Sequence, residues 1–423
     1  MCCVAKLYSR ILNTRLQKYL ESNEILVEEQ NGFRATKSCI DHIFVLCTIL
    51  RNRNISGKET FLCFIDFQKA FDSIDRNFLL YKLSQIGING NMYCAISSLY
   101  NNPKSRIILN DYETNYFDCP IGVKQGDCLS PTLFAIFIND LALEIKESKI
   151  GLNIDGNLLV NILLYADDIV LLSENEKDLQ SLLFIVERWC QKWRLDVNLS
   201  KTNILHIRGI RKPQSKFMFL FNKRPVEYCH HYTFLGVTLN EYLDFKFTCK
   251  VQSDSASRAL SAIVTKMIKN SGFPYNIYSL LYESCVTSIS DYGAEIFGYN
   301  DYDSNLNLHL RAIRAFIGVP KNAAKAGVLS EVGWVLPKYR TQIRMIRYYN
   351  RLLKMPEQRL SKKIFIWDKE FKIQNWSNEI KAIFHQAGLG NIFDTGTIFS
   401  LKPVQEHIKN AQMKSQKLSL ELE

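Results

Sequence analysis

The sequence has no apolar run long enough to cross a lipid bilayer, because Asn161 and an Asp-Asp pair interrupt its longest apolar stretch. Its N-terminal segment carries Lys6, Arg10 and Arg15, a spread of charge that excludes a secretory signal. Internal repeats and low-complexity linkers are also missing. These absences exclude a membrane-spanning chain, a secreted chain and a repeat array, and we expect an intracellular protein.

The cysteines form no metal or disulfide pattern. None of the 12 cysteines belongs to a C-x-x-C pair. Cys229-His230-His231 are adjacent residues without a spaced partner pair, so we interpret them as loop residues rather than metal ligands. The spacing predicts neither a zinc module nor a disulfide framework, and reduced thiols fit an intracellular protein.

The chain is long, ordinary in apolar content and basic. Its 423 residues predict two or three compact units, and 47% hydrophobic with 22% charged residues is typical of a globular protein. The formal charge of +11 favours a polyanionic partner, with nucleic acid first and an acidic membrane surface second.

Isolated aspartates mark two apolar segments. Residues 161–172 read as a buried hairpin with Asp167-Asp168 at its tip, although a solvated turn would give the same pair. Residues 61–67 form a nearly continuous apolar run, typical of a strand covered on both faces, and Asp66 lies near its end. Asp66 could instead cap a helix that begins after it at Gln68.

The remaining pattern supplies loops, short strands and helices. Residues 122–131 form a loop that opens a helix, and residues 232–239 predict one short strand. The character changes to helices from Ser253, so we place a boundary near residue 245, and the chain beyond Lys402 reads as a polar, frayed tail. Four arginines share one helix face without interleaved acids, which favours phosphate contact over a solvated face: Arg340, Arg344, Arg347 and Arg351.

Paired strands could bring the three aspartates together across a long sequence separation. Carboxylates are preferred ligands of Mg²⁺, and two such ions clamp the phosphoryl group during in-line transfer. Asp66, Asp167 and Asp168 in a basic chain therefore indicate a metal-dependent enzyme that acts on nucleic acid or nucleotides.

Several motifs in a fixed order then resemble a reverse transcriptase. Residues 64–72 (FIDFQKAFD), 125–131 (QGDCLSP) and 165–168 (YADD) carry the likeness. Residues 11–16 (ILNTRL), 29–34 (EQNGFR) and 234–236 (FLG) narrow it to the LINE-like, non-LTR retrotransposon class. Any one motif is a moderate signal, whereas the ordered set is strong.

The resemblance implies a role for each matched residue. Asp66 and Asp167 would bind two Mg²⁺ ions, which Mn²⁺ could replace, with Asp168 assisting and the carbonyl of Phe67 as a further ligand. Phe71 would exclude a 2′-OH, and Gln125 with Gly126 would shape the nucleotide pocket. Lys201 would protonate departing pyrophosphate, a general-acid role, and Leu235 with Gly236 would grip the primer end.

The resemblance also implies the fold and the partners. It predicts an α+β right-hand polymerase with partial fingers at 1–60, an antiparallel-sheet palm with a fingers insertion at 61–245, a helical thumb at 246–355 and a helical extension at 356–423. The implied partners are an RNA template, a DNA primer or target, their hybrid and dNTPs, in the cytoplasm and nucleus. The arginine face would lie along the hybrid, and no membrane partner and no oligomeric state are implied.

Departures from the family pattern leave other functions open. The chain begins just past the expected basic finger segment, has Asp127-Cys128 where Cys-Pro is commoner, and carries no endonuclease or zinc knuckle. We therefore expect an element truncated at its N-terminus. The alternatives are a catalytically impaired nucleic-acid-binding remnant and a group II intron maturase, which the lack of a basic tail and residues 292–296 (YGAEI) disfavour.

Overall fold

The computed structural model describes residues 3–110, 112–156, 158–371 and 375–421, with side chains as far as Met413. Two compact units divide the chain: unit 1 holds residues 1–41 and 58–230, and unit 2 holds residues 42–57 and 231–423. The division falls between His230 and His231, whereas the change in sequence character is near residue 245. Among the described residues, no helix combines the length and apolarity needed to cross a membrane.

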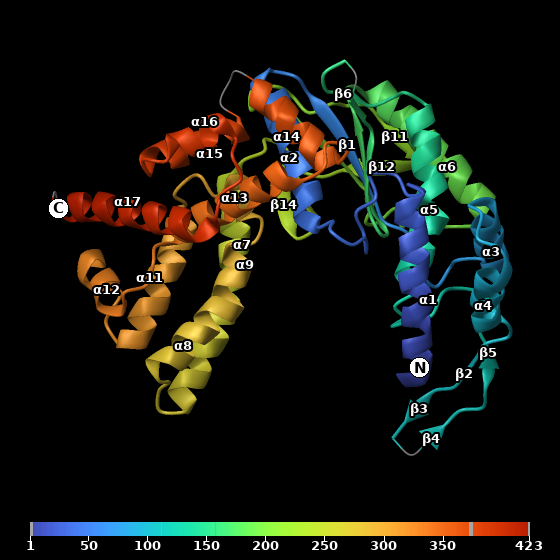
Figure 1. Ribbon diagram of the computed structural model, residues 1–423, viewed down its shortest axis with the longest axis horizontal. Helices are drawn as coiled ribbons and strands as arrows, with labels where there is room; N and C mark the ends of the chain where they lie inside the picture. Colours follow the sequence, from blue (N-terminus) through green and yellow to red (C-terminus); the bar gives the residue numbers. More distant parts are fainter. Residues whose placement is uncertain (1–2, 111, 157, 372–374, 422–423) are drawn as a thin grey trace. The chain divides into compact units, whose positions relative to one another are not determined.

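Unit 1 combines helices with one large sheet and several two-stranded pieces (Figure 1). Its elements are α1 (Cys3–Ser22), β1 (Thr60–Ile65), α3 (Arg76–Gln85), α4 (Gly90–Tyr100), β2 (Lys104–Ser105), β3 (Ile108–Leu109), β4 (Tyr112–Glu113), β5 (Phe117–Asp118), α5 (Ser130–Glu147), β6 (Leu152–Asn153), β7 (Leu159–Val160), β8 (Ile162–Tyr165), β9 (Asp168–Ser173), α6 (Glu176–Trp193), β10 (Asn203–Ile207), β11 (Phe219–Phe221) and β12 (Arg224–Tyr228).

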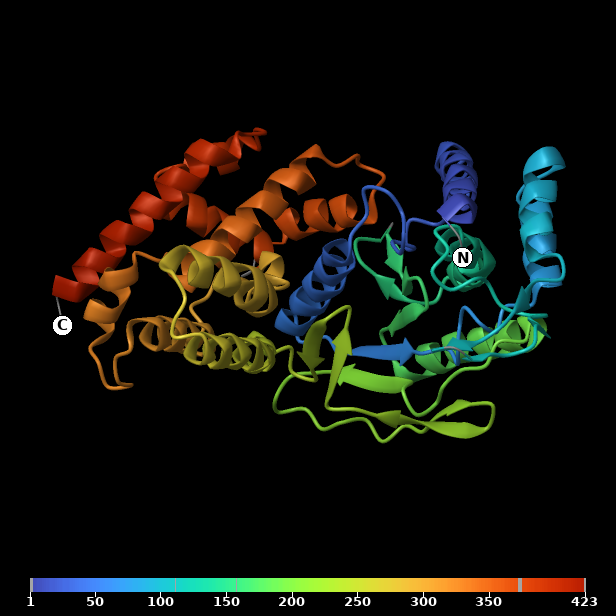
Figure 2. The same cartoon turned by 90° about the horizontal axis from the view of Figure 1, so that it is seen from below.

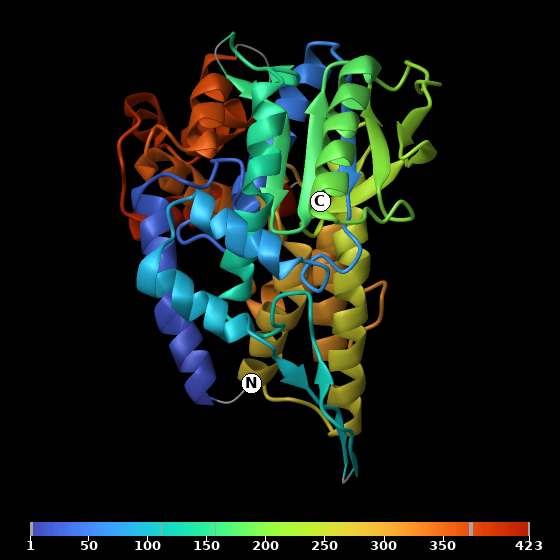
Figure 3. The same ribbon diagram turned by 90° about the vertical axis from the view of Figure 1, so that its right-hand side faces the viewer.

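The sheet of unit 1 has the strand order β11-β12-β10-β1-β9-β8, which places β1 between antiparallel neighbours. Figure 2 shows β1 and β10 side by side with opposite directions. All six residues of β1 are buried, as its continuous apolar run predicts. Helices α5 and α6 cover one face of the sheet (Figure 3), where Phe134 and Trp189 join the same apolar core as Cys63. The predicted buried strand and buried hairpin are confirmed.

Asp66 is not a helix cap, which corrects one alternative drawn from the sequence. The chain after β1 runs through turns, with Lys69 at φ +47°, and a helix begins only at Arg76. Asp75 caps that helix, because its carboxylate accepts hydrogen bonds from the backbone N–H groups of Asn77 and Phe78. The side chain of Asp66 is therefore available for another role.

Unit 2 is almost entirely helical apart from one hairpin. Its elements are α2 (Cys39–Ile55, whose first residues belong to unit 1), β13 (His231–Phe234), β14 (Val237–Asn240), α7 (Phe245–Lys269), α8 (Tyr275–Leu281), the π-helix η1 (Tyr282–Thr287), α9 (Ser288–Ser290), α10 (Ala294–Phe297), α11 (Asp303–Ile317), α12 (Lys325–Val332), α13 (Pro337–Lys354), α14 (Leu360–Glu370), α15 (Trp376–Gln386), α16 (Gly390–Thr395) and α17 (Leu401–Glu421).

Two segments of unit 2 differ from the expectation. Residues 232–239 are not one strand but the hairpin of β13 and β14, because the chain reverses at Leu235-Gly236. Residues 401–421 form helix α17 rather than a frayed tail. Val404 and Ile408, four residues apart on that helix, are both buried, so an apolar stripe stabilises an otherwise polar segment.

Candidate active site

The three aspartates lie at one edge of the sheet of unit 1, where strand β1 ends and the β8–β9 hairpin turns. Antiparallel pairing of β1 with β9 places Ile65 opposite Ile169, so Asp66 and Asp168 occupy the next position outward on neighbouring strands. Residues Ala166 and Asp167 form the two-residue turn between β8 and β9, whose last pair is Tyr165 with Asp168. The fold thus brings together carboxylates separated by about a hundred residues, as the sequence predicts.

Electrostatics confirm that the three carboxylates influence one another. Burial, the neighbouring Asp167 and then Asp66 raise the pKa of Asp168 to about 6. Burial and the charge of Asp66 also raise the pKa of Asp167, against the lowering effect of a backbone hydrogen bond. Negative charge therefore accumulates at this edge without full compensation, a condition that a bound cation relieves.

Of the three aspartates, Asp66 is the one to which the described part of the chain brings a cationic and an amide neighbour. Its Oδ2 accepts a hydrogen bond from Asn198 Nδ2 at 3.2 Å, and Lys201 Nζ lies 3.8 Å from the same oxygen. The loop that carries both neighbours is fixed to β1, because the backbone N–H of Asn198 donates to the carbonyl of Asp66 at 2.7 Å. Lys201, predicted as a general acid, thus lies beside the aspartates with an exposed side chain.

The carboxylates are near one another but do not form a closed ligand set. Within the described ranges, no three or more His, Cys, Asp or Glu side chains are gathered as a group that could hold a metal ion. The donor chemistry nevertheless suits a hard divalent cation, since burial and then the neighbouring carboxylates raise the pKa values of Asp167 and Asp168, and a bound cation would favour their ionised forms.

The residues predicted to surround a nucleotide lie on two adjoining loops. Gln125 Nε2 donates to both carboxylate oxygens of Asp72, at 2.9 and 3.0 Å, and the backbone N–H of Val123 donates to the carbonyl of Phe71. The ring of Phe71 is half-buried and stacks on Phe134, with centroids 4.7 Å apart. Phe67 is buried, which leaves its carbonyl rather than its ring as a candidate ligand.

Gly126 and Gly122 give this second loop its shape. Gly126 has φ +75°, a left-handed conformation that favours glycine. At Gly122, with φ +82°, a Cβ atom would lie 2.7 Å from the carbonyl oxygen of Asp72. The structure therefore holds the 122–126 loop against the chain that follows Asp66, which places Gln125 near Phe71.

Residues 29–32 also contact the aspartate turn, although the sequence assigned them no role. The backbone N–H of Asn31 donates to the carbonyl of Leu164, and the N–H of Leu164 donates to the carbonyl of Glu29, both at 2.9 Å. The side chain of Gln30 accepts a hydrogen bond from the backbone N–H of Ala166. The EQNGFR motif at residues 29–34 supported the family resemblance, but it did not indicate that these residues contact the aspartate turn.

Comparison with known proteins agrees with this arrangement. Residues 1–239, more than half of the chain, match the family described as "Reverse transcriptase (RNA-dependent DNA polymerase)". The chain belongs to the reverse transcriptase family. The predicted fold class, an α+β right-hand polymerase, is the one that this family implies, and the mixed sheet-and-helix architecture of the chain agrees with it.

Similar curated proteins include several from fly transposons. The chain is 24% identical to "Probable RNA-directed DNA polymerase from transposon BS" and 22% identical to "RNA-directed DNA polymerase from mobile element jockey", both of Drosophila melanogaster, over 75% of this chain and 35% of each relative. It is 29% identical to the R2DM Pol polyprotein of the same fly over 49% of this chain and 19% of that protein. The predicted likeness to non-LTR retrotransposons is confirmed, and the chain spans about a third of the length of the first two relatives.

The solved structures are more remote. Apo telomerase from Candida tropicalis is 14% identical, with a TM-score of 0.44 over 95% of this chain and 61% of that chain. At that score the likeness is weak.

This reverse transcriptase chain has a second functional candidate at the hairpin turn of unit 2. Leu235 and Gly236 have φ +47° and +82°, and the hydroxyl of Tyr292 donates to the carbonyl of Leu235 at 2.9 Å. A hollow of about 650 Å³ adjoins the turn, lined in part by Thr238, Gly236 and Arg258. The family match includes this turn and ends at residue 239.

Two arginines on this face of α13, Arg340 and Arg344, pair with acids from other segments, although the helix face itself carries no interleaved acids. Arg340 Nε lies 2.9 Å from Oδ2 of the buried Asp291, and Arg344 lies 3.5 Å from Glu295. A sequence that shows no acids on the same helix could not reveal partners from the chain around α9 and α10. Arg347 hydrogen-bonds the side-chain oxygen of Gln405 at 2.9 and 3.0 Å. The guanidinium of Arg351 lies over the ring of Tyr348.

Proposed function

We propose that this chain is an RNA-directed DNA polymerase. The primer 3′-OH would attack the α-phosphate of a dNTP on an RNA template, and pyrophosphate would leave. The observation that carries the proposal is the meeting of Asp66 with Asp167 and Asp168 at one sheet edge, where each shifted pKa reports a neighbouring carboxylate. This proposal fits the family to which the chain belongs.

Asp66 and Asp167 are the residues that would hold a pair of Mg²⁺ ions, with Asp168 and the carbonyl of Phe67 as supporting oxygens. Such ions, or Mn²⁺ in their place, lower the pKa of the attacking hydroxyl and stabilise charge on the phosphoryl oxygens. Lys201, whose ammonium group lies 3.8 Å from Oδ2 of Asp66, would protonate the leaving pyrophosphate. The protein would contribute position and charge rather than covalent chemistry.

Phe71, Gln125 and Gly126 would form the nucleotide pocket. The ring of Phe71 is braced by Phe134, so it presents a rigid surface that could reject a sugar with a 2′-OH. The two hydrogen bonds from Gln125 to Asp72 fix the loop that carries Gly126. These contacts, which would select the sugar by its shape, do not depend on a bound metal ion.

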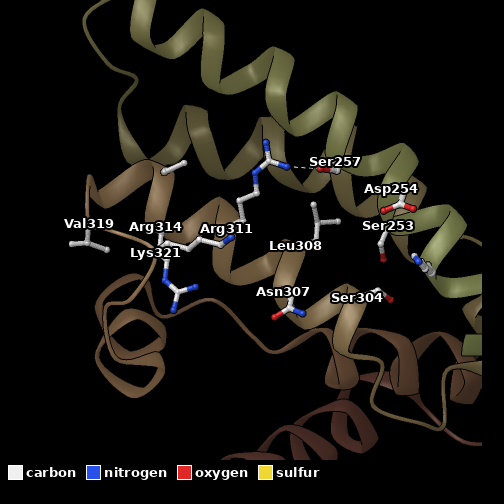
Figure 4. Close-up of a pocket in the computed structure, with 12 residues that line it drawn as sticks. Ser253, Asp254, Ser257, Ser304, Asn307, Leu308, Arg311, Arg314, Val319 and Lys321 are labelled. Atoms are coloured by element: carbon white, nitrogen blue, oxygen red, sulfur yellow. Dashed lines mark hydrogen bonds between the residues drawn. The ribbon is translucent and has the colours of Figure 1, made fainter.

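Unit 2 would supply contacts to the nucleic acid. Leu235-Gly236 would hold the primer end, and residues 246–355 of the unit would correspond to the thumb of a right-hand polymerase. A groove of about 1030 Å³ between α7 and α11 adds a basic surface, shown in Figure 4. Its charged residues are Lys250, Asp254, Arg311, Arg314 and Lys321, which gives four cations against one acid.

The groove between α7 and α11 suits a phosphate backbone. Within the described part of the chain, none of its four cations is in an ion pair. Arg311 of α11 donates to Ser261 Oγ of α7 at 2.9 Å, so its guanidinium is held against α7. The described residues that line the groove include no aromatic ring, whereas single-strand sites use rings for base stacking, so this lining favours a paired strand. An RNA–DNA hybrid is the partner that the proposed activity provides.

The test is extension of a labelled DNA primer on an RNA template with Mg²⁺ or Mn²⁺ and the four dNTPs. The proposal expects template-dependent products with the wild-type chain and none with Asp167→Ala. Salt-sensitive binding of the primer–template without extension in either metal would overturn the proposed activity and favour a nucleic-acid-binding remnant. Location in the cytoplasm and nucleus stays a prediction.

A further inference from the structure

Residues 27–34, called the strap below, run beside the aspartate hairpin at the outer edge of the sheet. Gln30 forms a parallel bridge with Leu164 of β8, and two backbone hydrogen bonds of 2.9 Å join Leu164 to Glu29 and Asn31. The strap therefore continues the hydrogen-bonding of the sheet by one short segment. It ends beside the turn that carries Asp167.

The side chain of Gln30 links the strap to that turn. Its Oε1 accepts hydrogen bonds from the backbone N–H of Gly32 at 2.8 Å and of Ala166 at 3.2 Å. Gln30 is fully buried, and its Nε2 has no hydrogen-bond partner among the described residues. A buried N–H donor without a partner costs stability. The hydrogen bonds of the Gln30 side chain are therefore the two that its oxygen accepts.

Gly32 lets the two backbones approach closely. A Cβ atom at this position would lie 2.3 Å from the backbone nitrogen of Ala166 and 3.0 Å from the carbonyl carbon of Tyr165. The conformation of Gly32 is not left-handed, so the close approach alone requires glycine. Any larger residue must displace either the strap or the aspartate turn.

The strap is itself anchored to helices. The guanidinium of Arg34 makes a bidentate pair with Glu21 of α1, with both N–O distances at 2.8 Å, and donates to the carbonyls of Val27 and Gln30. Lys146 of α5 pairs with Glu29 at 3.0 Å. The strap is thus a fixed support rather than a loose loop.

The turn needs such support. Ala166 has φ +58° at the first position of a two-residue hairpin turn, where a residue with a Cβ atom is strained and glycine is preferred. This backbone strain acts to change the conformation of the turn.

We infer that Gln30 and Gly32 are positioning residues, which hold the Ala166–Asp167 turn so that the carboxylate of Asp167 stays at the sheet edge. The consequence for catalysis rests on the proposed function. The restraint of the turn by Gln30 and Gly32 does not depend on the proposed function.

The kinetic test replaces Gln30 by a residue of similar volume that cannot accept the two hydrogen bonds. Gln30→Met is expected to lower kcat for dNTP incorporation about tenfold to a hundredfold while KM for dNTP changes little, because small displacements of a reacting group act on the chemical step. The matched control is Gln17→Met, which alters a glutamine bonded to Phe33 of the strap but not to the turn. Equal kcat in the two folded variants would overturn the inference.

A second variant tests the close approach. Gly32→Ala is expected to lower kcat about a hundredfold, whereas Gly209→Ala, where a Cβ atom would meet nothing within 4 Å, leaves it near the wild-type value. Far-UV circular dichroism checks that both variants are folded. A folded Gly32→Ala chain with wild-type kcat would contradict the role of Gly32.

Amide hydrogen exchange at Ala166 separates the two proposals, since it needs no activity. Loss of the acceptor in Gln30→Met is expected to speed exchange at the Ala166 N–H about tenfold relative to Gln17→Met. Fast exchange in Gln30→Met with no extension by the wild-type chain would support the strap and reject the polymerase. Extension by the wild-type chain with unchanged exchange in Gln30→Met would support the polymerase and reject the strap.

Discussion

Two hairpin turns, Ala166–Asp167 and Leu235–Gly236, carry candidate functional residues, and the two turns are stabilised in different ways. The turn of unit 1, Ala166–Asp167, has a left-handed residue that is not glycine and is held from outside by Gln30. The turn of unit 2, Leu235–Gly236, has two left-handed residues, and its second is glycine. Positive φ at both positions matches the type I′ turn that suits a hairpin.

The difference shows where each turn obtains its conformation. The Leu235–Gly236 turn also has a non-glycine residue at positive φ, Leu235, but its second residue is glycine, and the hydroxyl of Tyr292 donates a hydrogen bond to the carbonyl of Leu235. The Ala166–Asp167 turn carries backbone strain and contains no glycine, so it depends on its neighbours. The Ala166–Asp167 turn, which we propose binds metal, is thus expected to be more sensitive to its distant support than the Leu235–Gly236 turn, which we propose grips the primer.

The largest expected contrast comes from changing the tip of each turn. Asp167→Ala should lower kcat by about a thousandfold or more, because a ligand of the catalytic ions is lost. Its free energy of unfolding should be unchanged or higher at pH 7, since the raised pKa of Asp167 marks an unfavourable charge. Primer-extension kinetics and urea unfolding measure both quantities.

Gly236→Ala should show the opposite effect. Its Cβ atom would lie 3.0 Å from the ring of Tyr292 at φ +82°, so we expect a loss of about 1–2 kcal/mol of stability. A thousandfold loss of kcat in a folded Gly236→Ala chain would break the proposed division between the turns.

Relieving the strain at Ala166 sharpens the comparison. In the Ala166→Gly background the turn should keep its conformation without help, so Gln30→Met should lower kcat only about twofold, instead of tenfold or more. A double-mutant cycle on kcat measures the coupling. If the effect of Gln30→Met is the same in both backgrounds, backbone strain at Ala166 is not what the strap counteracts.

Acid should affect the two turns differently. Metal binding needs ionised carboxylates, and the pKa of Asp168 is about 6, so Mn²⁺ affinity should fall about tenfold between pH 7 and pH 5. Nucleic-acid affinity depends on arginine and lysine and should not fall over that range. In the metal-free protein, the raised pKa of Asp168 means that between about pH 4 and pH 6 the folded state binds a proton that the unfolded state has released. The free energy of unfolding should therefore decrease as the pH rises from about 4 to 6. Calorimetry at several pH values tests all three statements.

The smallest expected effect concerns the hydrogen bond at the second turn. Tyr292→Phe removes the donor to the carbonyl of Leu235 and should cost about 1 kcal/mol of stability. Tyr302→Phe is the matched control, since its hydroxyl donates to the carbonyl of Phe297 away from the turn. A loss of kcat in Tyr292→Phe alone would show that this turn also depends on a distant support for chemistry.

The sequence predicted the parts of the site that depend on strand pattern. A continuous apolar run predicted β1, and two apolar runs on either side of a polar tip predicted the β8–β9 hairpin. Antiparallel pairing in the structure then aligns Asp66 with Asp168. Such local patterns fix which residues face the sheet edge, because side chains alternate along a strand.

Contacts between distant segments could not be predicted in the same way. Nothing near Arg340 in the sequence indicates Asp291, and nothing in the EQNGFR motif indicates that Gly32 touches Ala166. Helix α17 was read as a frayed tail because, among its side chains as far as Met413, two buried residues, Val404 and Ile408, stand in a polar segment. These features depend on tertiary packing, which overrides local propensity.

The central claim is that Asp66 and Asp167 hold the same ions. The most direct test is Mn²⁺ titration, followed by electron paramagnetic resonance, of the chain bound to primer–template and a non-hydrolysable dNTP analogue. We predict two bound ions in the wild-type chain, and the loss of at least one in each of Asp66→Ala and Asp167→Ala. Two ions bound with wild-type affinity in either variant would contradict the account.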